Sequence, residues 1–95
     1  MTRRLGDLTW VEVDAAPQPL LLVPVGSCEQ HGPHLPRDTD TVIAVAVAGA
    51  VADAVSEASS NAGWLVLVAP PSSIGASGEH DGFAGTLSIG ANVLE

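Results

Sequence analysis

The side chains best suited to chemistry gather in two short stretches of this sequence. The first, residues 29–40, contains Glu29, His31 and Asp40. The second, residues 75–82, contains Glu79 and His80 among three glycines. Carboxylates and imidazoles are suitable ligands for Zn²⁺, Mn²⁺ or Fe²⁺ in proteins. The two stretches therefore predict a ligand-binding site, provided that the fold brings them to the same place.

The spacing within the first stretch favours metal ligation. Glu29 and His31 are two residues apart, so in an extended segment both side chains project from the same side. Asp40 follows at the start of a predicted helix, and its two carboxylate oxygens could bridge two ions. In the alternative interpretation, Asp38 or Asp40 caps that helix and His31 is a hydrogen-bonded loop residue. Spacing alone leaves both interpretations open.

The second stretch is either a substrate loop or a flexible surface loop. It cannot be a phosphate-binding loop of the P-loop type, because it lacks the GK[ST] ending and the chain has no lysine. Ser77 near His80 suggests a hydrolase triad, but no G-x-S-x-G elbow surrounds the serine. Cys28 has no neighbouring cation to activate it and is better explained as a small packing residue.

The elements that must position these stretches alternate between helix and strand. We predict a capped helix over 9–15, a buried strand over 20–26, a helix over 39–60 ended by residues 61–63, a buried strand over 64–69, a short strand over 86–89 and the start of a helix over 90–95. Strand, helix, strand with short links is typical of an α/β parallel sheet. Ligands bind beyond the carboxyl ends of such strands, where both stretches lie.

The long predicted helix has two different halves. Its first half carries no charge beyond its opening turn, which predicts burial on most sides. Its second half places polar side chains at helical spacing, which predicts one solvent-exposed stripe, namely Asp53, Ser56, Glu57 and Ser60.

Composition limits the partners and the compartment. Three basic against eleven acidic residues give a net charge of −8, which argues against nucleic acid or an anionic membrane as a partner. The longest uncharged apolar run, residues 42–52, is shorter than the roughly 20 residues of a membrane-spanning helix. A single cysteine fits a reducing cytosol. We therefore expect a soluble, cytoplasmic protein with no nucleic-acid or membrane partner.

Two sequence blocks resemble those of the creatininase family of metal-dependent amidohydrolases. The first reads VPVGSCEQHGPHLP over residues 23–36, followed by DTD over 38–40, and the second reads FAGTLSI over 83–89. Together they cover most of the chain from about Leu20 onward. Within the family, residues 75–90 are most similar to a branch of peptidases that trim a small, modified precursor peptide.

The resemblance implies a fold, a metal site and a substrate. The fold would be a three-layer α/β parallel sheet in a homo-oligomer, with residues 1–95 as the N-terminal portion of its single domain. Two divalent ions (zinc, manganese or iron) would bind, one on Glu29 and one on His31, with Asp40 bridging them. The substrate would be a small peptide or cyclic amide. The residues implied to contact it, or to orient the ligands, are His34, Glu79 and His80.

The resemblance also implies five metal ligands, of which this sequence carries three. The remaining His and Glu belong to a later motif, which residues 1–95 do not contain. We therefore expect a fragment that hydrolyses little by itself. Three alternatives remain: a creatinine-type cyclic amide hydrolase, a non-catalytic remnant that docks on full-length subunits, and an α/β binding domain without metal.

Overall fold

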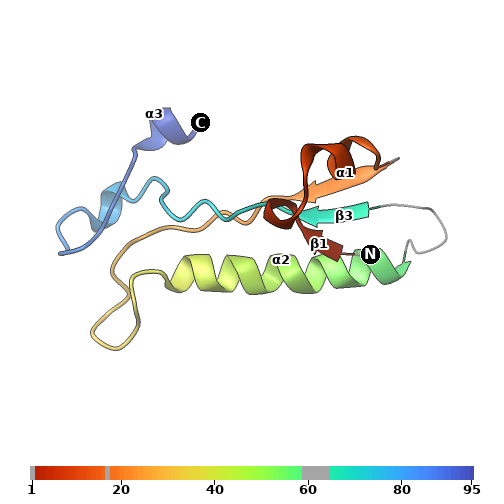
Figure 1. Ribbon diagram of the computed structural model, residues 1–95. Coiled ribbons are helices and arrows are strands. Elements are labelled where there is room, and N and C mark those ends of the chain that lie inside the picture. Colours follow the sequence, from red (N-terminus) through yellow and green to blue (C-terminus); the bar gives the residue numbers. More distant parts are fainter. Residues whose placement is uncertain (1, 17, 59–64) are drawn as a thin grey trace. The chain divides into compact units, whose positions relative to one another are not determined.

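The computed structural model describes residues 2–16, 18–58 and 65–95 (Figure 1). The chain forms two compact units. The sheet unit comprises residues 1–24 and 46–70, and the loop unit comprises residues 25–45 and 71–95. The sheet unit contains the regular secondary structure that identifies the fold class, whereas the loop unit contains both chemistry-bearing stretches.

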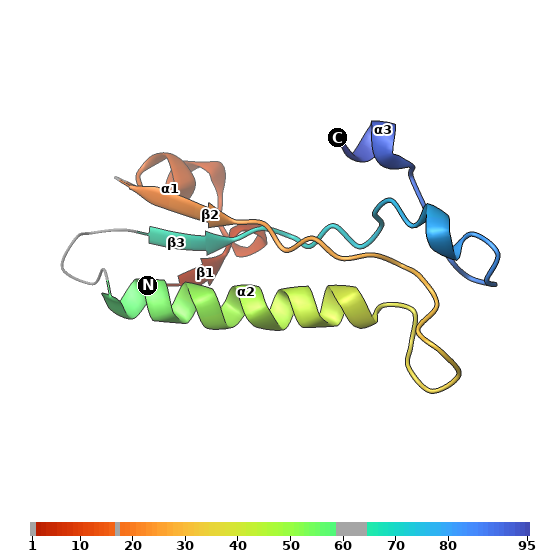
Figure 2. The same cartoon turned by 180° about the vertical axis from the view of Figure 1, so that it is seen from behind.

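The sheet unit is built on three parallel strands in the order β1-β3-β2 (Figure 2). Their bounds are β1 Thr2–Arg4, β2 Pro19–Leu22 and β3 Leu65–Val68. In the central strand, Val66 and Leu67 are fully or almost fully buried. Continuous apolar runs such as Leu65–Val68 are typical of strands covered on both faces of a parallel sheet. The predicted α/β class with a parallel sheet is therefore confirmed.

The strand boundaries differ from the predictions at one end of the sheet. The predicted buried strand over 20–26 ends at Leu22, and Pro24, which has no N–H to donate to the ladder, lies beyond it. Its predicted burial was wrong, because β2 is an edge strand and Leu21 is 49% exposed. The edge strand β1 was not predicted, because its sequence offers no apolar alternation. Its backbone nevertheless pairs with β3, Thr2 opposite Val66 and Arg4 opposite Val68. Backbone pairing of this kind requires no particular side chains, so the amino-acid sequence does not reveal it.

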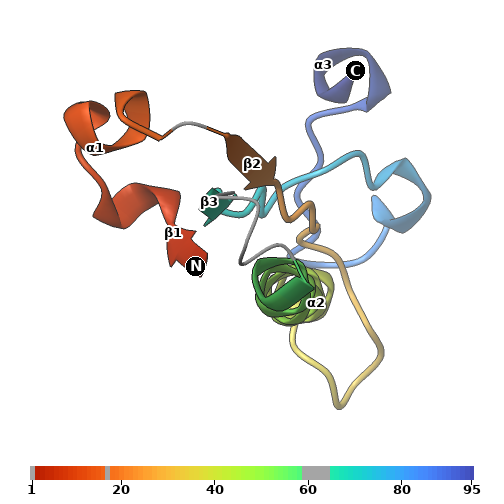
Figure 3. The same cartoon turned by 90° about the vertical axis from the view of Figure 1, so that its right-hand side faces the viewer.

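A short helix and a long helix flank the sheet within this unit. The short helix α1 (Trp10–Asp14) follows a 3₁₀ turn at Leu5–Asp7. It begins with the predicted capping box, in which Thr9 N–H donates to Glu12 Oε2 at 2.8 Å and Glu12 N–H donates to Thr9 Oγ1 at 3.3 Å. The part of α2 in this unit lies on the opposite face of the sheet from α1 (Figure 3). The sheet unit thus has three layers.

The long helix α2 (Thr39–Ala58) matches the prediction in length but not in burial. Residues 59–63, predicted to finish and close it, lie outside the described part of the chain. Of its described residues only Ala52 is buried, whereas Val42 and Val47 are each more than half exposed. The prediction of a buried first half was wrong for this chain, because no described element packs over that side. By length and composition alone α2 could also span a membrane, a test that core helices of soluble proteins pass.

The loop unit is held by single backbone bridges between extended segments. Cys28 pairs with Leu87 in antiparallel fashion, and Gly75 pairs with Ser88 in parallel fashion. The predicted strand over 86–89 is therefore wrong: these residues form isolated bridges, because the segment changes partner from one residue to the next. A 3₁₀ turn (Gly78–His80) and the short helix α3 (Ala91–Leu94) complete the unit, and α3 confirms the predicted helix start.

Gly26 is a packing requirement of the loop unit. A Cβ atom added there would lie 2.5 Å from the Cα atom of Thr41, in the first turns of α2. We expect Gly26→Ala to lower the free energy of unfolding by at least about 2 kcal/mol, because backbone atoms would have to move. Gly49→Ala is the matched control. An added Cβ meets nothing within 4 Å there, and a mid-helix glycine replaced by alanine gains about 0.5–1 kcal/mol. Urea unfolding of both variants tests the pair, and equal effects would contradict the packing role.

Candidate metal centre

The loop between residues 29 and 37 closes on itself and returns the chain to its starting point. Glu29 N–H donates to the carbonyl of Arg37 at 3.1 Å, and an antiparallel bridge joins His31 to Leu35 inside this loop. The chain then enters α2, with Asp40 in its first turn. Closure of the loop places Asp40, in the helix, beside Glu29 and His31 at the start of the loop.

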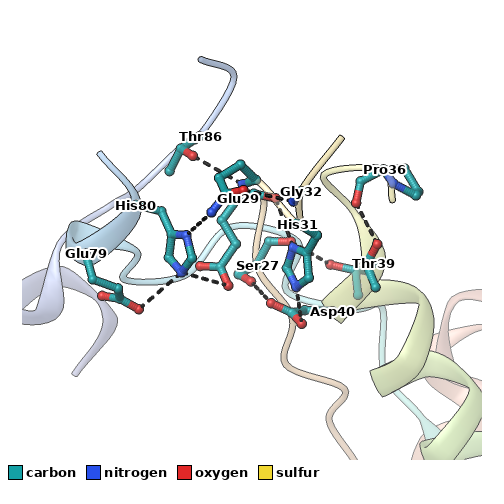
Figure 4. Close-up of polar contacts among 12 residues, drawn as sticks. Ser27, Glu29, His31, Gly32, Pro36, Thr39, Asp40, Glu79, His80 and Thr86 are labelled. Atoms are coloured by element: carbon teal, nitrogen blue, oxygen red, sulfur yellow. Dashed lines mark hydrogen bonds and ion pairs between the residues drawn. The ribbon is translucent and has the colours of Figure 1, made fainter. Parts of the chain in front are cut away.

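The structure brings the predicted ligands Glu29, His31 and Asp40 together. Each is half-buried and offers one ligand atom, and these three atoms lie within 4.8 Å of one another. His31 Nε2 lies 3.1 Å from Asp40 Oδ1 (Figure 4). Two carboxylates and an imidazole converging in a half-buried place fit a divalent cation in charge and in donor type. Metal ligation by these residues remains a prediction.

Hydrogen bonds to both of its oxygens orient Asp40. The Ser27 hydroxyl donates to Asp40 Oδ2 at 2.5 Å, and His31 faces Oδ1. The hydrogen bond from Ser27, with a further contribution from His31, lowers the pKa of Asp40. Because both oxygens face side chains of the loop unit, the structure disfavours the alternative in which Asp40 only caps α2.

His31 is oriented through its second ring nitrogen. Its Nδ1 atom lies 3.1 Å from the backbone carbonyl of Glu29. A carbonyl can only accept, so Nδ1 carries a proton and donates it there. This hydrogen bond, reinforced by the charge of Asp40, raises the pKa of His31. A metal-binding histidine usually donates one ring N–H to a backbone carbonyl or a carboxylate and binds the ion through its other nitrogen, and His31 has such an anchor at Nδ1.

A second group of side chains shares Glu29 with the first. Ligand atoms of Glu29, Glu79 and His80 also lie within 4.8 Å of one another. His80 Nε2 is 3.7 Å from Glu29 Oε1 and 3.9 Å from Glu79 Oε1 (Figure 4). His34 is exposed in the turn at residues 32–34 and belongs to neither group. Of the three residues predicted to contact substrate, the structure therefore places Glu79 and His80 beside the predicted ligands and leaves His34 apart.

Two polar neighbours of the ligands were not predicted from the sequence. Ser27 contacts Asp40, and the Gln30 side-chain amide contacts His80 at 3.2 Å. Both residues lie in the first resemblance block, which is the only signal in the sequence that could have identified them. Serine and glutamine are common loop residues, and their partners here are distant in sequence.

The structure does not support the Ser77–His80 triad. Ser77 is fully buried, and its hydroxyl has no partner among the described residues. The ring nitrogens of His80 face Gln30, Glu29 and Glu79 instead. Cys28 Sγ lies 3.6 Å from the carbonyl of Gly85, a weak contact that fits the packing interpretation.

The buried hydroxyl of Ser77, which has no hydrogen-bond partner among the described residues, is expected to lower the stability of the chain. We expect Ser77→Ala to raise the free energy of unfolding by about 1–2 kcal/mol, because a buried hydroxyl without a hydrogen bond carries a desolvation cost. Ser88→Ala is the opposite case, since Ser88 Oγ accepts from the backbone N–H groups of Ser77 at 2.9 Å and Gly90 at 3.2 Å. The melting temperature and the urea midpoint of unfolding should rise for Ser77→Ala and fall for Ser88→Ala. A loss of stability in Ser77→Ala would show that its hydroxyl is paired in solution.

Comparison with known proteins adds similarities that agree with this geometry. The family model "Creatininase: Creatinine amidohydrolase" matches residues 6–95. The mycofactocin precursor peptide peptidase of Mycolicibacterium smegmatis is 61% identical over 77 residues, which cover 81% of this chain and 30% of that protein. The protein of the same name from Mycobacterium tuberculosis is 51% identical over 93 residues, which cover 95% of this chain and 36% of that protein. The chain thus spans about a third of the length of these relatives.

Solved structures of creatininase are similar to this chain in fold. A single-residue creatininase mutant has a TM-score of 0.78 and 30% identity, over 98% of this chain and 36% of that chain. Another mutant, complexed with creatine, has a TM-score of 0.71 and 30% identity, over 98% of this chain and 35% of that chain. These similarities support the α/β class derived from the sheet unit.

Proposed function

Because the chain belongs to the creatininase family, we propose that it supplies part of the metal site of an amide-hydrolysing enzyme, a peptidase that trims the modified mycofactocin precursor peptide. The observation that carries this proposal is the convergence of Glu29, His31 and Asp40 within one closed loop and the helix turn that follows it. All three lie in the sequence block that resembles the family's signature.

The proposed site holds two divalent ions, zinc, manganese or iron. Glu29 would bind one ion, His31 the other, and Asp40 would bridge them. Such ions polarise an amide carbonyl and allow water to act as a nucleophile at neutral pH. The chain's own residues prepare this site: Ser27 holds the Asp40 carboxylate in place, and the Glu29 carbonyl turns the His31 ring toward it.

The proposed substrate is a peptide, because the relatives at 51–61% identity are named as peptidases of the mycofactocin precursor. A cyclic amide such as creatinine is the second candidate, supported by the creatininase structures at 30% identity. In either case we propose that Glu79 and His80, which lie beside Glu29, contact the substrate or orient this ligand. His34, exposed on its turn, would reach the substrate only from outside the ligand group.

The proposed setting is a cytoplasmic homo-oligomer. Exposed apolar side chains along α2, Val42, Ile43 and Val47 among them, support an assembly in which further protein covers this helix. The net charge of −8 supports the proposal that neither nucleic acid nor an anionic membrane is a partner.

A hybrid protein tests the proposed function. This chain would replace the matching segment of the Mycolicibacterium smegmatis relative, and the hybrid would be assayed with the modified precursor peptide and with creatinine. We expect peptide cleavage, lost in the Asp40→Asn hybrid and retained in the Asp38→Asn hybrid. Ring opening of creatinine instead would establish the second candidate. A folded, zinc-binding hybrid active on neither substrate would identify this chain as a non-catalytic remnant.

A further inference from the structure

We propose that His80 is a positioning residue for the Glu29 carboxylate, and that Gln30 fixes His80 in the tautomer that this role requires. The inference rests on the proposed function in one respect only, the assignment of Glu29 as a metal ligand. Three consecutive contacts within the loop unit support the proposal: Gly32 with Gln30, Gln30 with His80, and His80 with Glu29.

The first contact decides which way the Gln30 amide points. Gly32 N–H donates to Gln30 Oε1 at 2.9 Å. Only an oxygen can accept this bond, so the amide nitrogen Nε2 is the atom directed at His80. The backbone N–H of Gln30 also donates to Thr86 Oγ1 at 3.4 Å, which ties this residue to the second resemblance block.

The second contact decides which ring nitrogen of His80 carries the proton. Gln30 Nε2 lies 3.2 Å from His80 Nδ1. An amide N–H can only donate, so Nδ1 accepts, and the proton of the neutral ring sits on Nε2. Nε2 lies 3.7 Å from Glu29 Oε1 and 3.9 Å from Glu79 Oε1 (Figure 4). These distances are longer than a hydrogen bond, but they leave the partial positive charge of the N–H group close to the Glu29 carboxylate.

This tautomer excludes the simplest competing role for His80. Glu29, Glu79 and His80 could hold a cation by themselves, since their ligand atoms lie within 4.8 Å of one another. Ligation through Nε2 requires a lone pair on that atom, and in a neutral ring the proton would then sit on Nδ1, against the Gln30 amide donor. Two N–H donors would then face each other. To avoid this, the Gln30 amide would have to rotate by half a turn, which would break the hydrogen bond from Gly32 N–H to Gln30 Oε1. The contacts therefore favour an Nε2–H group close to the Glu29 carboxylate and argue against His80 as a metal ligand.

The consequence for Glu29 is a fixed orientation. Its side chain is 13% exposed and lies between His31 and Asp40 on one side and His80 on the other. A donor behind a ligating carboxylate restricts its rotation and favours the position in which it meets the metal. Loss of such outer partners typically lowers metal affinity by about 10–100-fold.

Two substitutions of His80 separate positioning from ligation. Glutamine can present an N–H near the position of Nε2, whereas asparagine reaches only the position of Nδ1. We expect His80→Asn to lower Zn²⁺ affinity by about 10–100-fold and His80→Gln to restore most of it. Isothermal titration with Zn²⁺ measures both, and circular dichroism shows whether each variant is folded. Equal losses in the two folded variants would overturn the positioning role.

The tautomer itself is measured by ¹⁵N spectroscopy of the histidine rings in the metal-free chain. We expect His80 to be protonated at Nε2, and the nearly isosteric Gln30→Glu change to move that proton to Nδ1. A parent chain protonated at Nδ1 would refute the inference even if zinc binds. A parent chain with the expected tautomer that binds no Zn²⁺ would instead refute the proposed function, and with it the positioning of a metal ligand.

Discussion

Replacing Asp40 with asparagine is expected to weaken Zn²⁺ or Mn²⁺ binding to this chain by more than about 100-fold, beyond the range typical of outer-shell changes. Asparagine keeps the size of the side chain but removes its charge and one acceptor oxygen. We expect the largest loss of metal affinity at Asp40, because Ser27 and His31 hold both of its carboxylate oxygens in place. In the proposed site it would also be the ligand common to both ions. Isothermal titration of the parent and the variant measures the effect.

Asp38→Asn is the matched control for this prediction. Asp38 lies two residues earlier, is exposed and belongs to neither group of ligand atoms. Its replacement changes the net charge by the same amount, so we expect almost no change in affinity. If both variants lost affinity equally, the metal would be attracted by the overall charge of −8 and not by a built site.

Metal affinity should also rise steeply with pH in the weakly acidic range. The pKa of His31 is raised by its hydrogen bond to the Glu29 carbonyl and by Asp40. Below that raised pKa the ring holds a proton that an incoming metal ion must displace, so affinity falls about tenfold for each unit of decreasing pH. Above it the ring is neutral and the dependence ends. Asp40, with its lowered pKa, stays ionised throughout this range and adds no slope.

Variants of the two neighbouring histidines test the origin of this dependence. His34→Gln should keep the full slope, because His34 is exposed and lies outside the ligand groups. His31→Gln should bind more weakly and lose the slope, since no proton remains to be displaced at that position. Titrations with Zn²⁺ at several pH values supply the slopes. An unchanged slope in His31→Gln would assign the competing proton to another group.

Local sequence signals were sufficient to predict the positions of several helices and strands. The spacing of Thr9 and Glu12 identified the start of α1, because a capping box uses only residues within one turn. The apolar runs at Leu20–Leu22 and Leu65–Val68 identified β2 and β3, because such runs are typical of parallel strands. The burial predicted for both strands holds for Val66 and Leu67 of β3, whereas Leu21 of β2 is about half exposed. Edge strand β1 was missed, since its pairing uses backbone groups that every sequence possesses.

For the site, the sequence determined the residue types and the tertiary structure decided which of them meet. Glu29, His31 and Asp40 could be named from ligand chemistry and spacing, because side chains eleven residues apart or fewer are brought together by one closed loop. The approach of His80 to Glu29 and Gln30, across 50 residues, depends on backbone bridges between segments that sequence periodicity does not reveal. The exposure of α2 was likewise decided by which elements pack against it, because an apolar helix is buried only where a partner covers it.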